Sequence, residues 1–186
     1  GGAGNTSLDN HVLVFFNGAG GSSRGAYKVI DLSGLSTGVD GFFLIAQAAV
    51  PGIADRVNAN TGIIYEGALQ NGEDGVGLYE NTTAADISTS SPKTQASDNL
   101  ANLLDAVVYQ TNDSDSGLIA EFGLSGNSLN EHAFGNKDTD SAGRTVDGAG
   151  APLDLGAWKI YDTPTPGVRN NPAEEISASL SEQTLS

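Results

Sequence analysis

Residues 10–46 contain three short runs rich in Val, Ile and Phe, and two turns rich in Gly and Ser separate these runs. Branched and aromatic side chains fill a pleated sheet surface, and glycine lets the chain enter a tight turn, so each run predicts a strand. Similar runs recur further along the chain. The pattern predicts strands at residues 11–16, 26–32, 41–47, 62–65, 75–80, 104–109 and 157–161. Short strands with frequent turns are typical of an all-β sandwich or barrel rather than of a parallel α/β sheet.

The composition of the chain excludes several classes of partner. Its 186 residues suit one domain with a complete hydrophobic core. Eight basic against 23 acidic residues give a net charge of −15, which repels phosphate backbones, so we expect no nucleic-acid partner. No run approaches the roughly 20 apolar residues of a membrane-spanning helix, so no membrane span is expected. The chain has no cysteine and no methionine, not even at position 1, which is typical of a secreted and cleaved product.

Two stretches, residues 82–102 and 125–152, predict long loops because they are rich in small and polar residues. Loops of this length often carry function, so we expect a partner surface there. Residues 117–122 fit either a short helix or a strand.

The C-terminal segment, residues 171–186, supports two interpretations. Asn171 followed by Pro172 and two glutamates has the pattern of a helix start. Ile176, Ala178 and Leu180 instead alternate with the period of a strand. In either form, we expect these three side chains to make an interface.

Six short sequence motifs are similar to those of a known family. In order they are LVFFNG at 13–18, YKVIDLSG at 27–34, DGFFLI at 40–45, LQNGEDGVGLY at 69–79, LDAVVY at 104–109 and TPTPG at 163–167 with Asn170. In these six motifs the chain resembles the lamin-tail (LTD-like) family in its bacterial, secreted form. The resemblance implies an immunoglobulin-like β-sandwich over residues 1–170, with long loops and a C-terminal extension at 171–186. Members of that family are commonly non-catalytic modules, so it implies no catalytic residues.

The chain departs from the family pattern at both ends. The family opens with a strand pair before the first motif, whereas only residues 1–10 precede it here. The family ends near the last motif, whereas this chain continues to Ser186. The resemblance therefore implies that an N-terminal strand is missing and that a C-terminal segment is added. A sandwich that lacks a strand exposes unpaired N–H and C=O groups, which invite another strand to pair.

These expectations lead to one functional hypothesis with alternatives. The C-terminal segment is expected to dock on its own domain or on the next subunit, and the second arrangement gives a head-to-tail polymer. The chain would then be a non-enzymatic extracellular subunit of a filament or surface layer, and thus a homo-oligomer or polymer. The alternatives are an isolated secreted module and a trimmed fragment, in which the domain is an accessory or binding domain of a secreted nuclease or phosphoesterase.

Two short acidic motifs are candidate cation sites. Asp113 and Asp115, and likewise Asp138 and Asp140, bring carboxylates within reach of a hard cation such as calcium. The alternative is that these residues form turns in solvated loops, a role that Asp fills well.

Candidate catalytic groups are sparse. Only His11 and His132 could act as bases near neutral pH, and no G-x-S-x-G motif for a nucleophilic serine is present. Trp158, Tyr161 and Tyr109 could stack a sugar, although single aromatic residues on strands usually belong to the core.

Overall fold

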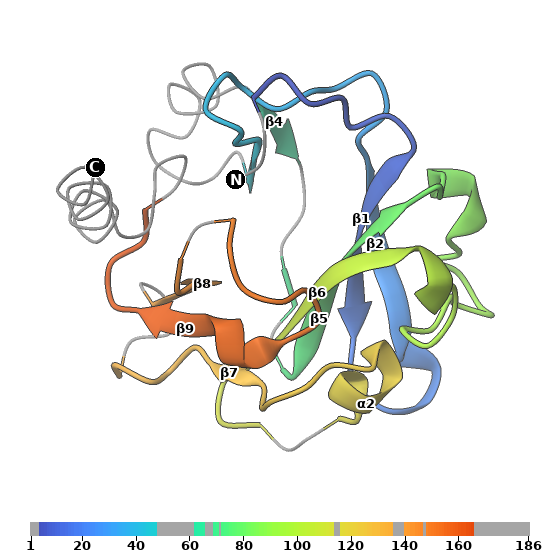
Figure 1. Cartoon of the computed structure of the whole chain (residues 1–186). Coiled ribbons are helices and arrows are strands. Elements are labelled where there is room, and N and C mark those ends of the chain that lie inside the picture. The colour runs from blue at the N-terminus through green and yellow to red at the C-terminus, as the bar shows by residue number, and fades with distance from the viewer. Residues whose placement is uncertain are drawn as a thin grey trace, which may run out of the picture.

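A five-stranded sheet forms the centre of the molecule. The computed structural model describes residues 4–47, 62–65, 69–70, 72–113, 116–135, 140–146 and 148–165. The sheet has the strand order β2-β1-β5-β6-β7, and its strands are antiparallel except for the parallel pair β6–β7 (Figure 1). The strands are β1 (His11–Asn17), β2 (Gly25–Asp31), β5 (Asp74–Glu80), β6 (Leu103–Gln110) and β7 (Leu129–Asn130).

Two further strand pairs face this sheet. The parallel pair consists of β3 (Leu44–Gln47) and β4 (Gly62–Tyr65), and the antiparallel pair consists of β8 (Ser141–Arg144) and β9 (Trp158–Tyr161). The pairs lie apart from each other, with β4 at the top of Figure 1 and β8–β9 at the lower left. One short helix, α2 (Leu118–Phe122), and the 3₁₀ turns Gly21–Ser23, Ala84–Asp86, Leu100–Asn102 and Leu155–Ala157 complete the described part of the chain. The fold is all-β and has the layered form of a sandwich, as the sequence predicts.

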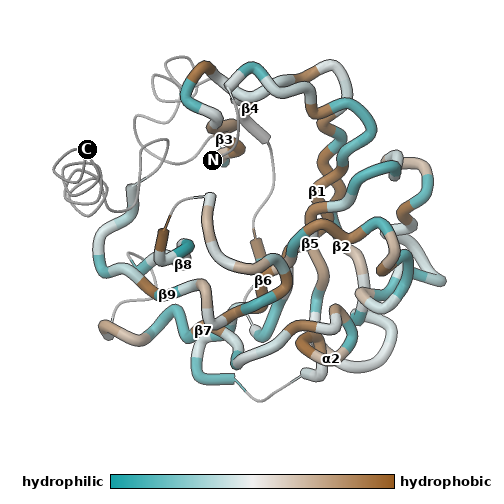
Figure 2. Tube along the Cα trace, viewed as in Figure 1, coloured by the Kyte–Doolittle hydropathy of each residue, from teal (hydrophilic) through white to brown (hydrophobic). Residues whose placement is uncertain are grey.

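The central strands are apolar on both faces of the sheet. On the first face, Val12, Val14 and Phe16 of β1 are buried in the main core together with Tyr79 and Phe122. The second face carries a separate apolar cluster. Its members include Leu13, Phe15, Ile30, Val76 and Leu78, together with Phe43, Ile45 and Ile63 from the β3–β4 side. Figure 2 shows the apolar residues along β1, β3 and β6.

Helix α2 packs closely on the first face because β5 has glycines there. A Cβ atom added at Gly75 would lie 2.7 Å from the Phe122 ring, and one added at Gly77 would lie 2.8 Å from the Tyr79 ring. Phe122 also meets Phe16 edge to face, with ring centroids 5.3 Å apart. Leu118 and Phe122 are both buried, and their spacing of four residues places them on one side of the helix.

The structure confirms all seven predicted strands, with bounds that differ by at most three residues. The prediction of a loop throughout residues 125–152 is wrong in part, because β7 and β8 lie within it. Residues 117–122, for which the sequence left two possibilities, form helix α2. The C-terminal segment, with Ile176, Ala178 and Leu180, lies outside the described residues.

Candidate interaction surface

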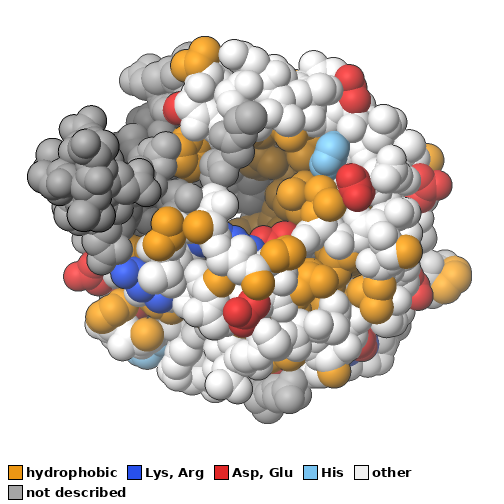
Figure 3. Space-filling view, in the orientation of Figure 1, with side chains coloured by type: hydrophobic (Ala, Val, Ile, Leu, Met, Phe, Trp, Pro, Cys, Tyr) orange, Lys and Arg blue, Asp and Glu red, His pale blue; other side chains and the backbone are white. Residues whose placement is uncertain are grey.

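The second face of the central sheet is hollowed beside the β8–β9 pair. The hollow has a volume of about 190 Å³. Its wall consists of Leu13, Val76, Leu78, Ala106, Val107, Asp105 and Trp158. Figure 3 shows a hollow on this side of the molecule, with hydrophobic side chains on its wall. We call it the apolar hollow.

The geometry of β5 explains why the wall is apolar. Successive side chains of a strand point to opposite faces, so Val76 and Leu78 lie on the same face. Their partners in the ladder are Phe15 and Leu13 of β1, and Val76 also pairs with Val107 of β6. Leu13, Val76, Leu78 and Val107 form an apolar strip across the three strands. Burial of such a strip against other apolar side chains is favourable, because it removes apolar surface from water.

One polar residue of the wall, Asp105, holds the β8–β9 pair against the sheet. Its carboxylate forms an ion pair with Arg144 of β8, and its Oδ1 accepts a hydrogen bond from the Leu153 N–H at 3.0 Å. The Arg144 guanidinium lies over the Trp158 ring, 5.0 Å from the ring centroid. It also donates to the main-chain oxygen of Ala149 at 3.1 Å. Asp105 and Arg144 therefore have a structural role that fixes one side of the apolar hollow.

The outer edge of β2 is a second exposed feature of the sheet. The Leu32 N–H donates to the His11 main-chain oxygen, so every second residue of β2 counted back from Leu32 points its backbone N–H and C=O groups towards β1. The backbone groups of Val29 and Asp31 therefore point away from β1, towards the outer edge of the sheet. Nearer the start of β2, the Ala26 N–H donates to the Thr94 oxygen at 2.8 Å. Within the described ranges, no backbone segment pairs with the edge at Val29 and Asp31. Unpaired edges of this kind can accept an additional strand.

The loop region at 82–102, where the sequence predicts a partner surface, contains a polar hollow of about 410 Å³. Its wall includes Asn81, Asp86, Thr94, Asp98, Asn99 and Asn102. Several of these groups hydrogen bond within the loop itself: Asp86 accepts from Thr83, and Asp98 accepts from the Gln95 N–H. They therefore serve first to hold the loop in shape.

Only half of the predicted calcium ligands lie in the described ranges. Asp113 accepts from the Thr111 N–H at 3.0 Å, and Asp140 accepts from the Phe134 N–H at 3.0 Å. Both carboxylates thus make turn contacts. Asp115 and Asp138 lie outside the described residues, so the two predicted pairs stay predictions. Among the residues that the structure describes, no group of three or more His, Asp or Glu side chains is arranged to hold a metal.

A different acidic pair is buried, although no pattern in the sequence predicts it. Glu73 and Asp74 lie at the start of β5, where the pattern predicts a turn, yet only 5% and 1% of their surfaces are exposed. Burial, which disfavours the charged form, raises the pKa of Asp74 above its ordinary value. Alternating polarity cannot reveal such a pair, because both residues read as part of a solvated turn.

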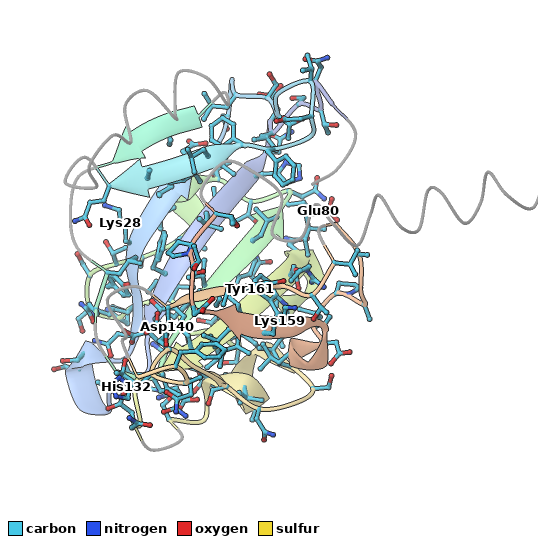
Figure 4. The ribbon with its side chains drawn as sticks, turned by 90° about the vertical axis from the view of Figure 1, so that its left-hand side faces the viewer. Lys28, Glu80, His132, Asp140, Lys159 and Tyr161 are labelled. Atoms are coloured by element: carbon cyan, nitrogen blue, oxygen red, sulfur yellow. The ribbon has the colours of Figure 1, made fainter. Side chains whose placement is uncertain are left out.

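The histidines and aromatic residues have local structural contacts. His11 Nδ1 lies 2.8 Å from the Asp9 main-chain oxygen. In Figure 4, His132 and Asp140 lie towards one side of the ribbon, apart from Glu80. The Tyr161 hydroxyl donates to the Arg144 oxygen at 2.8 Å, and Lys159 Nζ lies 4.7 Å from the Tyr161 ring centroid. Tyr109 is buried in the sheet, so it is not available to stack a sugar.

No helix among the described residues is long and apolar enough to cross a membrane. Comparison of the chain with protein-family models, with curated proteins and with solved structures gave no match.

Proposed function

We propose that the chain is a non-enzymatic extracellular structural subunit that assembles through its C-terminal segment into a filament or surface layer. The apolar hollow is the observation that carries the proposal. Among the residues that the structure describes, the second layer of the sandwich consists of two separate strand pairs, and the apolar side chains of the central sheet line an open hollow beside the β8–β9 pair. A further strand laid across this hollow would complete the layer.

The proposed occupant is residues 176–180 of a second copy of the chain. In a strand, Ile176, Ala178 and Leu180 would lie on one face, and the intervening serines would lie on the other. Val76 and Leu78 of the hollow have the same spacing of two residues along β5. An apolar row on the donor strand therefore matches an apolar row on the acceptor sheet.

Donation between copies explains why assembly would continue beyond a dimer. The donor segment and the acceptor hollow are different surfaces, so each subunit uses one of each. Such a head-to-tail contact is not self-complementary, and it forms an open filament when its rotation does not close a ring. The extracellular location and the immunoglobulin-like topology rest on the resemblance to the secreted lamin-tail form.

Complementary variants test this proposal. Leu78→Glu places a charge in the hollow and leaves the donor segment intact, whereas a chain that lacks residues 172–186 has the reverse defect. Each variant alone should be a monomer of about 18.9 kDa or slightly less by light scattering. A mixture of the two should form a capped dimer, because each supplies the surface that the other lacks.

Val39→Glu is the matched control, since Val39 is apolar but 85% exposed and lies outside the hollow. This variant should assemble as the wild type does. Assembly that survives both the deletion and Leu78→Glu would contradict the proposal. A wild-type chain that is monomeric, and whose melting temperature falls after the deletion, would show that the segment docks within its own domain.

A further inference from the structure

The polar hollow has a buried inner wall and a polar rim. Its volume of about 410 Å³ lies within the range of roughly 300–1,000 Å³ that small-molecule pockets have. Thr82 and Ile87 line the hollow and are only 1% and 7% exposed, whereas Asn81, Asp86 and Asp98 lie at the surface. No residue of this wall belongs to the wall of the apolar hollow. The polar hollow is therefore a separate cavity that opens to solvent.

Hydrogen bonds between side chains of the wall fix the direction of its amide groups. Asn102 Nδ2 donates to Asn99 Oδ1 at 2.8 Å, and Asn99 Nδ2 donates to Thr82 Oγ1 at 2.9 Å. The Thr82 hydroxyl donates in turn to the Glu80 main-chain oxygen at 2.9 Å. Because the nitrogen of Asn102 has its acceptor within the wall, its Oδ1 is held as an acceptor for another group.

Two carboxylates of the wall each have a second unused oxygen. Asp86 accepts both donors of Thr83 through Oδ2, and Asp98 accepts the Gln95 N–H through Oδ2. Within the described part of the chain, Asp86 Oδ1, Asp98 Oδ1 and Asn102 Oδ1 accept no hydrogen bond. The wall thus offers three oriented acceptors, which can exchange water for the hydroxyl groups of a ligand.

The same wall also offers donors and an apolar surface. The Asn81 side chain has no hydrogen bond to any other described residue, so its amide is available both to donate and to accept. Thr94 Oγ1 accepts from the Ser88 N–H at 2.8 Å and keeps its own hydrogen for a further acceptor. Ile87 adds an apolar contact between these polar groups.

This mixture of groups favours one class of ligand. An ammonium group would use the acceptors and leave the donors unused. A phosphate or another anion would be repelled by Asp86 and Asp98, and no basic residue is among those that line the hollow in the described ranges. Hydroxyl groups both donate and accept, and the C–H groups of a sugar ring can cover Ile87.

We propose that the polar hollow binds a neutral polyhydroxylated ligand, namely one pyranose unit of a carbohydrate. Its hydroxyl groups donate to the three free oxygens of Asp86, Asp98 and Asn102, and they accept from Asn81 and Thr94. The proposed assembly uses the apolar hollow and does not depend on this site, so either proposal can fail alone.

Saturation-transfer difference NMR of the full chain tests the proposal. This method observes the ligand, so it works whether or not the chain has assembled. The probes are glucose, galactose, mannose and N-acetylglucosamine, each added separately. A ligand of about 12 non-hydrogen atoms is expected to bind with a Kd on the order of 1–10 mM. At least one of these sugars should receive magnetisation from the protein. Absence of transfer to all four would overturn the proposal.

Two variants locate the sugar. Asn81→Gly removes the free amide, and glycine suits the positive φ of 49° at this position, so the contacts within the loop stay intact. It should weaken binding about three- to tenfold. Asp98→Asn can still accept from the Gln95 N–H but replaces the free oxygen by a donor, so it should weaken binding by about tenfold or more.

Asn5→Gly is the matched control, because Asn5 is also exposed with a positive φ of 55° but lies outside the hollow. This variant should bind the sugar as the wild type does. If Asn81→Gly and Asp98→Asn also kept the wild-type Kd, the sugar would bind elsewhere and the assignment to the polar hollow would be wrong.

Discussion

Arg144 of β8 and Asp105 of β6 form an ion pair that joins the β8–β9 pair to the second face of the central sheet. Their side chains are only 14% and 26% exposed, respectively. The Asp105 carboxylate also accepts from the Leu153 N–H, so it holds both the β8 strand and the segment that leads into β9. Because Trp158 stacks on Arg144, the pair also fixes the Trp158 side of the apolar hollow.

Asp105→Ala should lower the free energy of unfolding by about 2–3 kcal/mol, since it leaves a largely buried guanidinium without its charged partner. Urea denaturation measures this change, and Trp158, the single tryptophan, reports the β8–β9 pair by fluorescence. The double variant Asp105→Ala with Arg144→Met should recover part of the loss, because it removes the unpaired charge as well.

Lys159→Ala is the matched control for this prediction. Lys159 lies in the same strand pair, where its ammonium group lies over the Tyr161 ring, so its loss should cost less than about 1 kcal/mol. Equal losses for Asp105→Ala and Lys159→Ala would mean that the ion pair does not hold the strand pair in place.

Gly18→Ala and Gly20→Ala should differ sharply although they are two residues apart. A Cβ atom at Gly18 would meet a backbone oxygen at 2.1 Å, and backbone cannot swing aside as a flexible side chain can. We expect a loss of at least about 1–3 kcal/mol in unfolding free energy. At Gly20, where φ is −69° and nothing lies within 4 Å, alanine should be neutral or stabilise by up to about 1 kcal/mol. Chemical denaturation of both variants checks the contrast, and similar values would contradict it.

The two-sided burial of the central strands explains which parts of the fold the sequence predicts. In β1, both alternating sets of side chains are apolar, so the run from Val12 to Phe16 is unmistakable. By contrast, β8 is the sequence SAGR, which has small and polar residues and no apolar period. It is a strand because it pairs with β9 and because Arg144 reaches Asp105, which is a tertiary contact that no local pattern contains.

The same distinction applies to the candidate sites. An apolar second face of the sheet could be predicted from the sequence, because the residues of β1 that alternate with Val12 and Val14 are also apolar. The shape of the apolar hollow could not, since it depends on where the β8–β9 pair packs on the sheet. The buried state of Glu73 and Asp74 depends on Gly18 and Ser116, which are distant in sequence. Carboxylates in turn-like sequence are normally solvated, so the pattern pointed to Asp113 and Asp140 instead.

The carboxylate of Asp86 should titrate below the ordinary aspartate pKa of about 3.9. The Thr83 N–H donates to it at 2.8 Å and the Thr83 hydroxyl at 2.7 Å, and these hydrogen bonds lower the pKa by favouring the charged form. A lowered folded-state pKa contributes stability above the unfolded pKa, and this contribution is lost as the pH falls through the folded pKa. Carboxyl chemical shifts measured by NMR against pH report the value directly.

Thr83→Val removes the hydroxyl donor and keeps the backbone donor, so the Asp86 pKa should rise part of the way towards its ordinary value. Asp31 is the internal control, because Ser33 lowers its pKa independently of Thr83. A parallel rise at Asp31 would indicate a change in the whole fold rather than the loss of one hydrogen bond.

The proposed assembly should strengthen as salt is added. Every subunit carries a net charge of −15, and the donor segment itself contains Glu174 and Glu175, whereas the proposed contact is apolar. Raising the ionic strength from about 20 mM to about 300 mM shortens the Debye length from roughly 20 Å to roughly 6 Å, which weakens the repulsion between subunits. Light scattering should therefore show a lower concentration threshold for assembly at high salt.

Glu174→Gln with Glu175→Gln should reduce this salt dependence, which separates charge screening from a general effect of salt on apolar contacts. Dissociation at high salt would instead show that ion pairs hold the subunits together, and the apolar hollow would then not be the docking site.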